Sequence, residues 1–308
     1  MKFALIVALI LLLLMAALAA WLWTPDRPRD ELEARYAAGK DDFLDVAGIR
    51  LHVRDRGPRE APAVLLLHGF GSSLHTWEPF ADALAADLRV ISVDLPGAGL
   101  SAADPDADYS DARSLEVLLA LLDHWQLARV SLVGNSLGGR IAWRFAAAHP
   151  DRVERLVLIA PDGFASPGFE YGKAPDVPAL LRLLRFALPK SVLRMNLLAA
   201  YADPERLTDA HVRRYHDLLL APGNRDAMLE RMAQVVLERP EPLLASIKAP
   251  TLLVWGERDA MIPFSNARDY LSALPDARLV SFPELGHVPH EEAPARAVEP
   301  VRAFLVGD

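Results

Sequence analysis

One serine of this 308-residue sequence is flanked by glycines in a pattern that suits nucleophilic chemistry. Ser136 lies in Gly134-Asn135-Ser136-Leu137-Gly138, a G-x-S-x-G arrangement whose small residues permit a strained turn that exposes the serine hydroxyl. An apolar run over residues 130–133 precedes it and residues of helical composition follow, which predicts strand, turn and helix. Backbone N–H groups at the start of that helix favour developing negative charge. Such turns also occur for packing alone, so this interpretation needs a base and an acid elsewhere.

A serine hydroxyl is a poor nucleophile at neutral pH and needs an imidazole to accept its proton, and the imidazole needs a carboxylate to orient it. Ser136, Asp259 and His287 each follow directly after a predicted strand. Because the carboxyl ends of parallel strands share one edge of a sheet, we expect these side chains to converge there. Two alternatives remain open at this stage: Glu257 as the acid, with Asp259 capping the next helix, and His290 as the base.

The elements that position these residues are short apolar runs alternating with helical segments, which predicts an α/β fold with a mostly parallel eight-stranded sheet. The predicted strands are 43–46, 48–55, 63–67, 89–93, 130–133, 155–160, 251–255 and 278–282. The first two form a hairpin, in which we expect His52 and Asp55 at exposed positions. Helices are predicted at 77–88, 114–125 and 293–306, and from residue 137 onward.

The segment from about residue 162 to 249 has a different pattern. Its prolines divide leucine- and arginine-rich helical pieces, and no buried strand is predicted within it. We interpret it as a helical lid inserted over the carboxyl edge of the sheet, within a domain that spans residues 43–308. Its apolar residues are core residues of the lid or line a pocket for an acyl chain.

The N-terminus contains 21 consecutive apolar residues, Phe3 to Trp23, enough to cross about 30 Å of hydrocarbon as a helix. Trp21 and Trp23 lie where interfacial aromatic residues occur. We therefore predict a single-pass membrane anchor at residues 1–24, followed by a tether at 25–42 that becomes a short helix. The alternative is a signal peptide cleaved near Ala17-Leu18-Ala19, which would leave a secreted or periplasmic protein. Positive charges lie on both sides of the run, so they do not fix its orientation.

Composition narrows the function classes further. The net charge of −8 argues against a nucleic-acid partner, for which a basic face is expected. The chain has no cysteine, which excludes disulfides, thiolate metal sites and a cysteine nucleophile. Several histidines have no partner at metal-ligand spacing, so we predict no metal. These are His75, His124, His149, His211 and His216.

Taken together, the motifs resemble those of the α/β-hydrolase fold family, in its serine esterase and lipase group, over roughly Phe43 to Val306. The chain order serine, aspartate, histidine is that of this family. An N-terminal anchor with a short lid is similar in layout to membrane-bound monoacylglycerol-lipase-like hydrolases. The matching motifs are His68-Gly69-Phe70-Gly71, Asp94-Leu95-Pro96-Gly97, the turn at Ser136, Trp255-Gly256-Glu257-Arg258-Asp259 and Gly286-His287.

The resemblance implies Ser136 as nucleophile, His287 as general base and then acid, and Asp259 as the orienting acid. It also implies an oxyanion hole formed by the backbone N–H groups of Phe70 and Leu137, and no cofactor. Three further residues are expected to be structural: His68 shaping the oxyanion turn, Asp94 forming a turn and Asn135 packing in the elbow.

The expected function is a membrane-anchored serine hydrolase that cleaves a hydrophobic or lipid-derived small-molecule ester through an acyl-enzyme. Serine at the elbow argues against haloalkane dehalogenase and epoxide hydrolase chemistry, because members of the family with those activities carry aspartate there. Two alternatives remain: a carbon–carbon bond hydrolase with the same three residues, and a non-catalytic member that uses the fold for binding.

Overall fold

The computed structural model describes residues 2–165 and 170–307. Its strands are β1 (Phe43–Val46), β2 (Ile49–Arg56), β3 (Ala63–Leu67), β4 (Arg89–Val93), β5 (Val130–Asn135), β6 (Val153–Ile159), β7 (Thr251–Gly256) and β8 (Ala277–Phe282). Its α-helices are α1 (Lys2–Leu22), α2 (Arg29–Tyr36), α3 (Glu78–Leu84), α4 (Asp111–His124), α5 (Leu137–Ala148), α6 (Ala179–Arg182), α7 (Lys190–Leu198), α8 (Asp209–Leu219), α9 (Asn224–Gln234), α10 (Glu241–Leu244), α11 (Asn266–Ala273), α12 (Pro289–Glu292) and α13 (Pro294–Val306).

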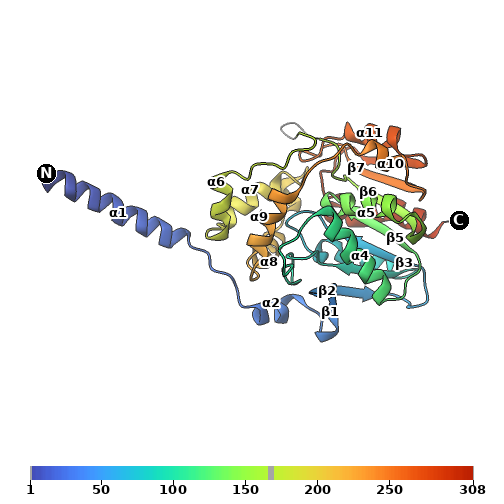
Figure 1. The fold of residues 1–308 in the computed structure, drawn as a ribbon, viewed down its shortest axis with the longest axis horizontal. Helices are drawn as coiled ribbons and strands as arrows, with labels where there is room; N and C mark the ends of the chain where they lie inside the picture. The colour runs from blue at the N-terminus through green and yellow to red at the C-terminus, as the bar shows by residue number, and fades with distance from the viewer. Residues whose placement is uncertain (1, 166–169, 308) are drawn as a thin grey trace.

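The strands form one sheet in the order β1-β2-β4-β3-β5-β6-β7-β8 (Figure 1). β2 is antiparallel to β1 and to β4, and the remaining strand pairs are parallel. The predicted α/β class and the mostly parallel eight-stranded sheet are therefore confirmed. Each predicted strand is present, with its ends within two residues of the prediction. The parallel strands could be located because a strand buried on both faces is a nearly continuous apolar run in the sequence.

Helices cover both faces of the sheet. Along β3, Val64 and Leu66 point to one face, and Leu65 and Leu67 to the other. The first face packs against α3 and α13, and the second against α4, α5 and α11. This two-sided burial fixes the register of every central strand, since a slip of one residue would exchange the two faces.

The expected exposure of His52 and Asp55 is wrong. His52 is fully buried, and its Nδ1 lies 2.7 Å from the carboxylate of Asp94. Asp55 is half-buried and pairs with Arg89 at 2.8 Å. The hairpin does not stand free: β2 also pairs with β4, and the ring of Phe43 packs against His52 from β1. β2 is thus an inner strand of the sheet, and the ring of His75 stacks on His52, with ring centres 5.7 Å apart.

Between β6 and β7 the described residues contain helices α6 to α10 and no strand, in agreement with the sequence pattern. In Figure 1, α6 to α9 group at the end of the sheet nearest α1, whereas α10 lies beside α11. We call α6 to α9, with the turns between them, the cap. Residues 166–169 of the predicted lid segment lie outside the described residues.

The apolar N-terminal run forms α1, which projects away from the sheet and its helices (Figure 1). Its length and composition suffice to cross a membrane, and a signal sequence near the N-terminus meets the same criteria. The segment that follows is packed against the domain: Leu32 of α2 is fully buried. Asp217 of α8 also accepts hydrogen bonds from Arg35 and Tyr36.

Candidate active site

Ser136 lies between β5 and α5 with a backbone φ of 53° and ψ of −118°, a region that residues other than glycine rarely occupy. Backbone hydrogen bonds stabilise this strained conformation. The Ser136 N–H donates to the carbonyl of Ile159, and the Ser136 carbonyl accepts from the N–H groups of Arg140 and Asp162. Gly138 must lack a side chain here, because a Cβ would lie 2.1 Å from the carbonyl oxygen of Leu67. The turn therefore has the sharp geometry that the G-x-S-x-G pattern predicts.

His287 and Asp259 form a close pair across the loops that follow β8 and β7. His287 Nδ1 lies 2.7 Å from Asp259 Oδ2, and both side chains are almost completely buried. The other carboxylate oxygen of Asp259 accepts from the backbone N–H groups of Met261 and Ile262 at 2.8 and 2.9 Å. One carboxylate thus orders its own loop and fixes the imidazole. With the proton on Nδ1, Nε2 is left as the proton acceptor.

The histidine loop is attached directly to the serine turn. The Asn135 side-chain amide donates to the carbonyl oxygens of Ile159 and His287, at 3.0 and 3.1 Å. Ser136 and His287 line the same cavity of about 670 Å³. Asn135, expected to be a packing residue, therefore also joins the two loops that present the hydroxyl and the imidazole.

The two alternatives from the sequence have other positions. Glu257 is exposed and accepts a hydrogen bond from Ser281 at 2.7 Å, away from the imidazole. His290 is fully buried, stacks on Trp77 with ring centres 4.2 Å apart, and lies 3.2 Å from the hydroxyl of Thr76. Burial lowers the pKa of His290 to about 3, so this imidazole is neutral. The geometry therefore favours Asp259 and His287 as the acid and the base.

Phe70 and Leu137 line the same cavity as Ser136. Leu137 is the first residue of α5, so its N–H has no intrahelical acceptor. The Phe70 loop approaches the serine turn closely: a Cβ on Gly69 would lie 3.0 Å from Asn135 Oδ1 and 3.3 Å from Ser136 Cβ. The two loops thus lie close together, and the oxyanion hole formed by the N–H groups of Phe70 and Leu137 stays a prediction.

His68 and Asp94 hold the loops behind this site. His68 is buried, and its Nε2 accepts from the backbone N–H of Leu95 at 3.0 Å, which agrees with a structural role. Asp94 does more than form a turn: it accepts from the N–H groups of Leu74 and Leu100 and pairs with His52. Burial raises the pKa of Asp94, but the neighbouring histidines, His52 above all, lower it further, to about 2. The carboxylate is thus ionised at neutral pH.

The cavity that contains Ser136 and His287 has a mostly apolar lining. Eleven of its seventeen lining residues are apolar, including Phe164 before the cap and Met232 and Leu237 at its far end. Asp162, whose N–H donates to the Ser136 carbonyl at 3.0 Å, is one of the polar lining residues, and burial raises the pKa of its carboxyl. Such a lining suits a substrate with a hydrophobic body and one polar, reacting group.

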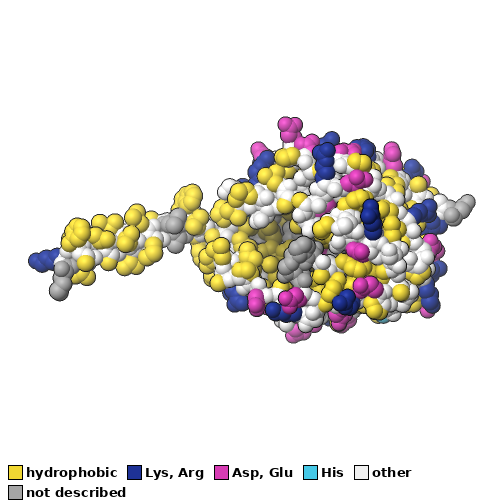
Figure 2. All heavy atoms as spheres, turned by 90° about the horizontal axis from the view of Figure 1, so that it is seen from above, with side chains coloured by type: hydrophobic (Ala, Val, Ile, Leu, Met, Phe, Trp, Pro, Cys, Tyr) yellow, Lys and Arg dark blue, Asp and Glu magenta, His cyan; other side chains and the backbone are white. Residues whose placement is uncertain are grey.

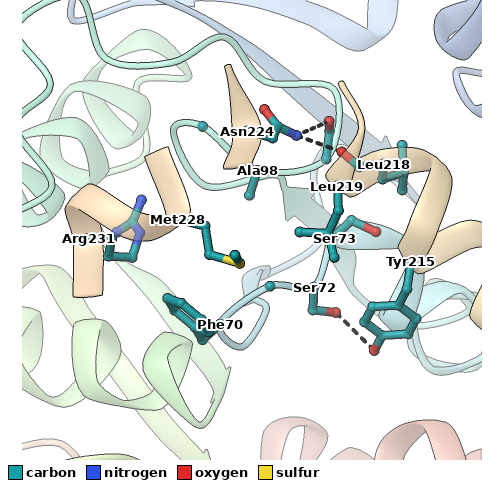
Figure 3. A pocket seen from close by; sticks show the side chains of 13 residues that line it. Phe70, Ser72, Ser73, Ala98, Tyr215, Leu218, Leu219, Asn224, Met228 and Arg231 are labelled. Atoms are coloured by element: carbon teal, nitrogen blue, oxygen red, sulfur yellow. Dashed lines mark hydrogen bonds between the residues drawn. The ribbon is translucent and has the colours of Figure 1, made fainter. Parts of the chain in front are cut away.

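A buried polar cluster connects the cap to the loop after β3 that carries Phe70 and Ser72, which we call the oxyanion loop after the role expected for Phe70. Tyr215 of α8 donates to Glu291 at 2.8 Å. It also accepts from the Ser72 hydroxyl at 3.2 Å, as Figure 3 shows. Glu291 also pairs with Arg214 and accepts from Thr76. A cavity of about 30 Å³, room for roughly one or two water molecules, remains between the oxyanion loop and the cap. The sequence gives no sign of this cluster, because its members are distant in the chain and carry no motif.

Comparison with known proteins identifies the family. The sequence model of the family described as alpha/beta hydrolase fold matches residues 62–294. The chain belongs to this family. The matched range begins before β3 and ends at the start of α13, so this alpha/beta hydrolase contains the complete parallel part of the sheet within the family region.

Two bacterial relatives show how varied similar chains are. This alpha/beta hydrolase is 33% identical, over 85% of its length and 68% of the relative, to the dihydrolipoyllysine-residue acetyltransferase component of the acetoin cleaving system of Pseudomonas putida. It is 32% identical to 2-hydroxy-6-oxononadienedioate/2-hydroxy-6-oxononatrienedioate hydrolase of Cupriavidus pinatubonensis, over 83% of this chain and 92% of the relative. Several similar proteins are named as hydrolases, which supports a hydrolase here.

Among solved structures, the hydrolase is similar to a membrane phospholipase A described as a bacterial virulence factor. The identity is 26% and the TM-score 0.74. The match covers 100% of this chain and 99% of the phospholipase, so it includes α1 as well as the hydrolase domain.

Proposed function

We propose that the protein is a membrane-anchored serine hydrolase that cleaves hydrophobic carboxylic esters, with Ser136, His287 and Asp259 as its catalytic residues. The observation that carries the proposal is the 2.7 Å contact between His287 Nδ1 and Asp259, in a cavity that the strained Ser136 also lines. Hydroxyl, imidazole and carboxylate on three separate loops are the parts that acyl transfer needs.

In the first step the Ser136 oxygen attacks the ester carbonyl carbon while His287 Nε2 takes the hydroxyl proton. The negative charge on the carbonyl oxygen is stabilised by the N–H groups of Phe70 and Leu137, each contributing about 3 kcal/mol. Asp259 stabilises the imidazolium that forms. Collapse of the tetrahedral intermediate breaks the ester C–O bond, and the alcohol leaves with the proton from His287. Water activated by His287 then hydrolyses the acyl-enzyme.

The apolar cavity and α1 together favour a hydrophobic ester. A cavity of about 670 Å³ has room for an acyl chain of substantial length, and most of its lining offers no hydrogen bond. The similar structure that aligns over the whole chain, α1 included, is named as a membrane phospholipase A. Both points support the anchor and the ester substrate.

The test is a fluorophosphonate probe combined with p-nitrophenyl esters of increasing acyl length. We expect the wild type to be labelled, Ser136→Ala to remain unlabelled, and kcat/KM to rise from acetate to medium and long chains. A folded wild-type protein that is not labelled would contradict the proposed chemistry and favour a non-catalytic binding role.

A carbon–carbon bond hydrolase is the second candidate, and the names of the curated relatives favour it. Four of them are named as hydrolases of 2-hydroxy-6-oxo dienoates, the vinylogous diketones in which such enzymes cleave a carbon–carbon bond. Rates with a 2-hydroxy-6-oxohexadienoate and with a long-chain ester, measured on one preparation, separate the two candidates. A kcat/KM at least a hundredfold higher for the dienoate would replace the ester proposal.

A further inference from the structure

The exposed apolar side chains of the folded domain are concentrated on one face. Among the described residues after α1 and Trp23, nine large apolar side chains are exposed, and five of them lie between residues 180 and 195. A soluble surface normally spreads such residues singly. These five, which we call the cap face, are Leu180, Leu183, Phe186, Val192 and Met195.

The residues directly after α1 pack against the cap face, with no flexible linker between them. Only two residues after α1, Thr24 N–H donates to the carbonyl oxygen of Phe186 at 2.9 Å, and the ring of Trp23 stacks on that of Phe186. The side chain of Arg225 in α9 holds the same point, donating to the carbonyl of Thr24 and to Asp26. A helix of 21 residues is about 30 Å long, which matches the hydrocarbon thickness. If α1 spans a bilayer, the cap face must therefore lie at its surface.

Charge on this part of the cap suits a membrane surface. Residues 179–195, which include the cap face, contain four basic side chains and no acidic one, in a chain whose net charge is −8. Two of the four, Arg185 and Arg194, pair with Asp226 and Asp209. Arg182 and Lys190 are exposed and flank the apolar residues of the cap face. Basic residues around exposed apolar ones are typical of segments that bind anionic lipid headgroups.

The mouth of the active-site cavity lies beside the cap face. Lys173, Pro175 and Pro178 line the cavity, and Pro178 directly precedes α6, which carries Leu180. In Figure 2 the hydrophobic side chains gather on the end of the domain from which α1 emerges, around a hollow. The path into the cavity and the apolar surface therefore share one side of the molecule.

We propose that the cap face lies in the headgroup region of a phospholipid bilayer and that the substrate reaches Ser136 from the lipid phase instead of from water. This inference rests on the proposed anchor and adds to it an orientation: the cap, not the far side of the sheet, contacts the membrane. The occupant of the cap face is the bilayer surface, because the chain passes from α1 directly onto it.

The native chain has no cysteine, so single cysteines carrying a nitroxide label report depth without other changes. The full-length protein is reconstituted in phosphatidylglycerol–phosphatidylcholine vesicles and labelled in L183C and M195C on the cap face and in L12C within α1. V306C is the matched control, an exposed apolar position in α13. We expect the labels at positions 183, 195 and 12 to collide more often with oxygen, and less often with a water-soluble nickel chelate, than the label at position 306.

Two results would overturn the inference in different ways. If position 12 is in lipid while 183 and 195 remain in water, the anchor stands and the orientation is wrong. If position 12 is also in water, the anchor itself is wrong, and the inference is lost with it.

The route of the substrate is tested by activity. Leu180→Glu and Met195→Glu place a charge at two well-exposed positions outside the cavity lining. We expect hydrolysis of a long-chain ester embedded in vesicles to fall at least tenfold, and hydrolysis of a soluble short-chain ester to stay within twofold. Val306→Glu should change neither rate. Unchanged rates on both substrates, or equal losses on both, would contradict access from the lipid phase.

Discussion

The carboxyl edge of the sheet and the cap are built in opposite ways. The central strands that lead to the edge are buried on both faces: every residue of β4, β5 and β7 is buried, whereas β8, before His287, is only partly buried. In the cap, α6 and the 3₁₀ turn that follows it (Leu183–Arg185) have no buried residue, and Leu180 and Leu183 are exposed. A rigid edge can hold reacting groups within the narrow tolerance that catalysis demands, whereas a surface that only covers the site tolerates far more change.

The cap nevertheless reaches the site through polar contacts. The N–H of His287 donates to the carbonyl oxygen of Ala200, between α7 and α8, at 2.8 Å. Tyr215 and Arg214 of α8 contact Glu291, and the same carboxylate accepts from Thr76 beside the oxyanion loop. Burial raises the pKa of Glu291, but Arg214 and neighbouring histidines lower it further, so it stays ionised. The two regions thus differ in packing: the central strands are completely buried, whereas the outer part of the cap is exposed.

The largest effect is expected at the edge itself. Ser136→Ala removes the nucleophile, and kcat should fall about 10⁴- to 10⁶-fold while the protein stays folded. Steady-state hydrolysis of p-nitrophenyl esters and circular dichroism measure the two quantities. The control is Ser272→Ala, an exposed serine of α11, which should leave kcat unchanged. Residual activity near the wild-type rate would rule out Ser136 as the nucleophile.

The second-largest loss of kcat is expected when the contact between Asp259 and His287 is broken. Asp259→Asn keeps the shape of the side chain but removes the charge and favours the wrong imidazole tautomer, so kcat should fall by about 10⁴. Glu257→Gln, two residues earlier and exposed, is the matched control and should change kcat less than twofold. Equal losses in the two variants would mean that the loop, and not the carboxylate of Asp259, is what matters.

The two regions can be compared directly by the loss of unfolding free energy that one leucine-to-alanine substitution causes in each. Leu66 is fully buried in the central strand β3, so Leu66→Ala should lower the free energy of unfolding by about 2–5 kcal/mol. Leu180 in α6 is 75% exposed, and Leu180→Ala should change that free energy by less than about 0.5 kcal/mol. Urea unfolding in detergent solution measures both. A large loss from Leu180→Ala would show that the cap face is packed in solution.

Acid should destabilise the folded protein by protonating the buried histidines behind the edge. Burial lowers the pKa of His290 to about 3 and that of His75 to about 4, below the ordinary value of 6.5. The unfolded chain then binds more protons below pH 6.5, so stability is complete above that pH and is lost as the pH falls toward the folded pKa values. Each histidine contributes a slope of up to about 1.4 kcal/mol per pH unit.

His290→Gln should therefore make the decrease in unfolding free energy between pH 6.5 and pH 4 shallower by about that slope. Urea unfolding at a series of pH values measures it. His124→Gln, an exposed histidine at the end of α4, is the control and should leave the slope as in the wild type. An unchanged slope in His290→Gln would show that His290 does not stay neutral in the folded protein.

Much of the edge was predictable from local signals. A glycine-flanked serine after an apolar run predicts the turn at Ser136, and the rule that parallel strands end on one edge predicts that His287 and Asp259 meet. The burial of His52 was not predictable, because an alternating strand looks the same whether its polar face meets water or a buried carboxylate such as Asp94. Glu291 could not be recognised either, since neighbouring acidic residues in the sequence give no sign of which one is buried.

The amino-acid sequence by itself determined the order of strands and helices, the strained turn and the apolar N-terminal helix, because each depends on residues close together in the chain. Only the tertiary structure decided that Asp259 rather than Glu257 contacts the imidazole, that Asn135 joins the serine and histidine loops, and that Trp23 meets Phe186. Those contacts join residues far apart in the chain, and which of several similar side chains makes them depends on how the elements pack.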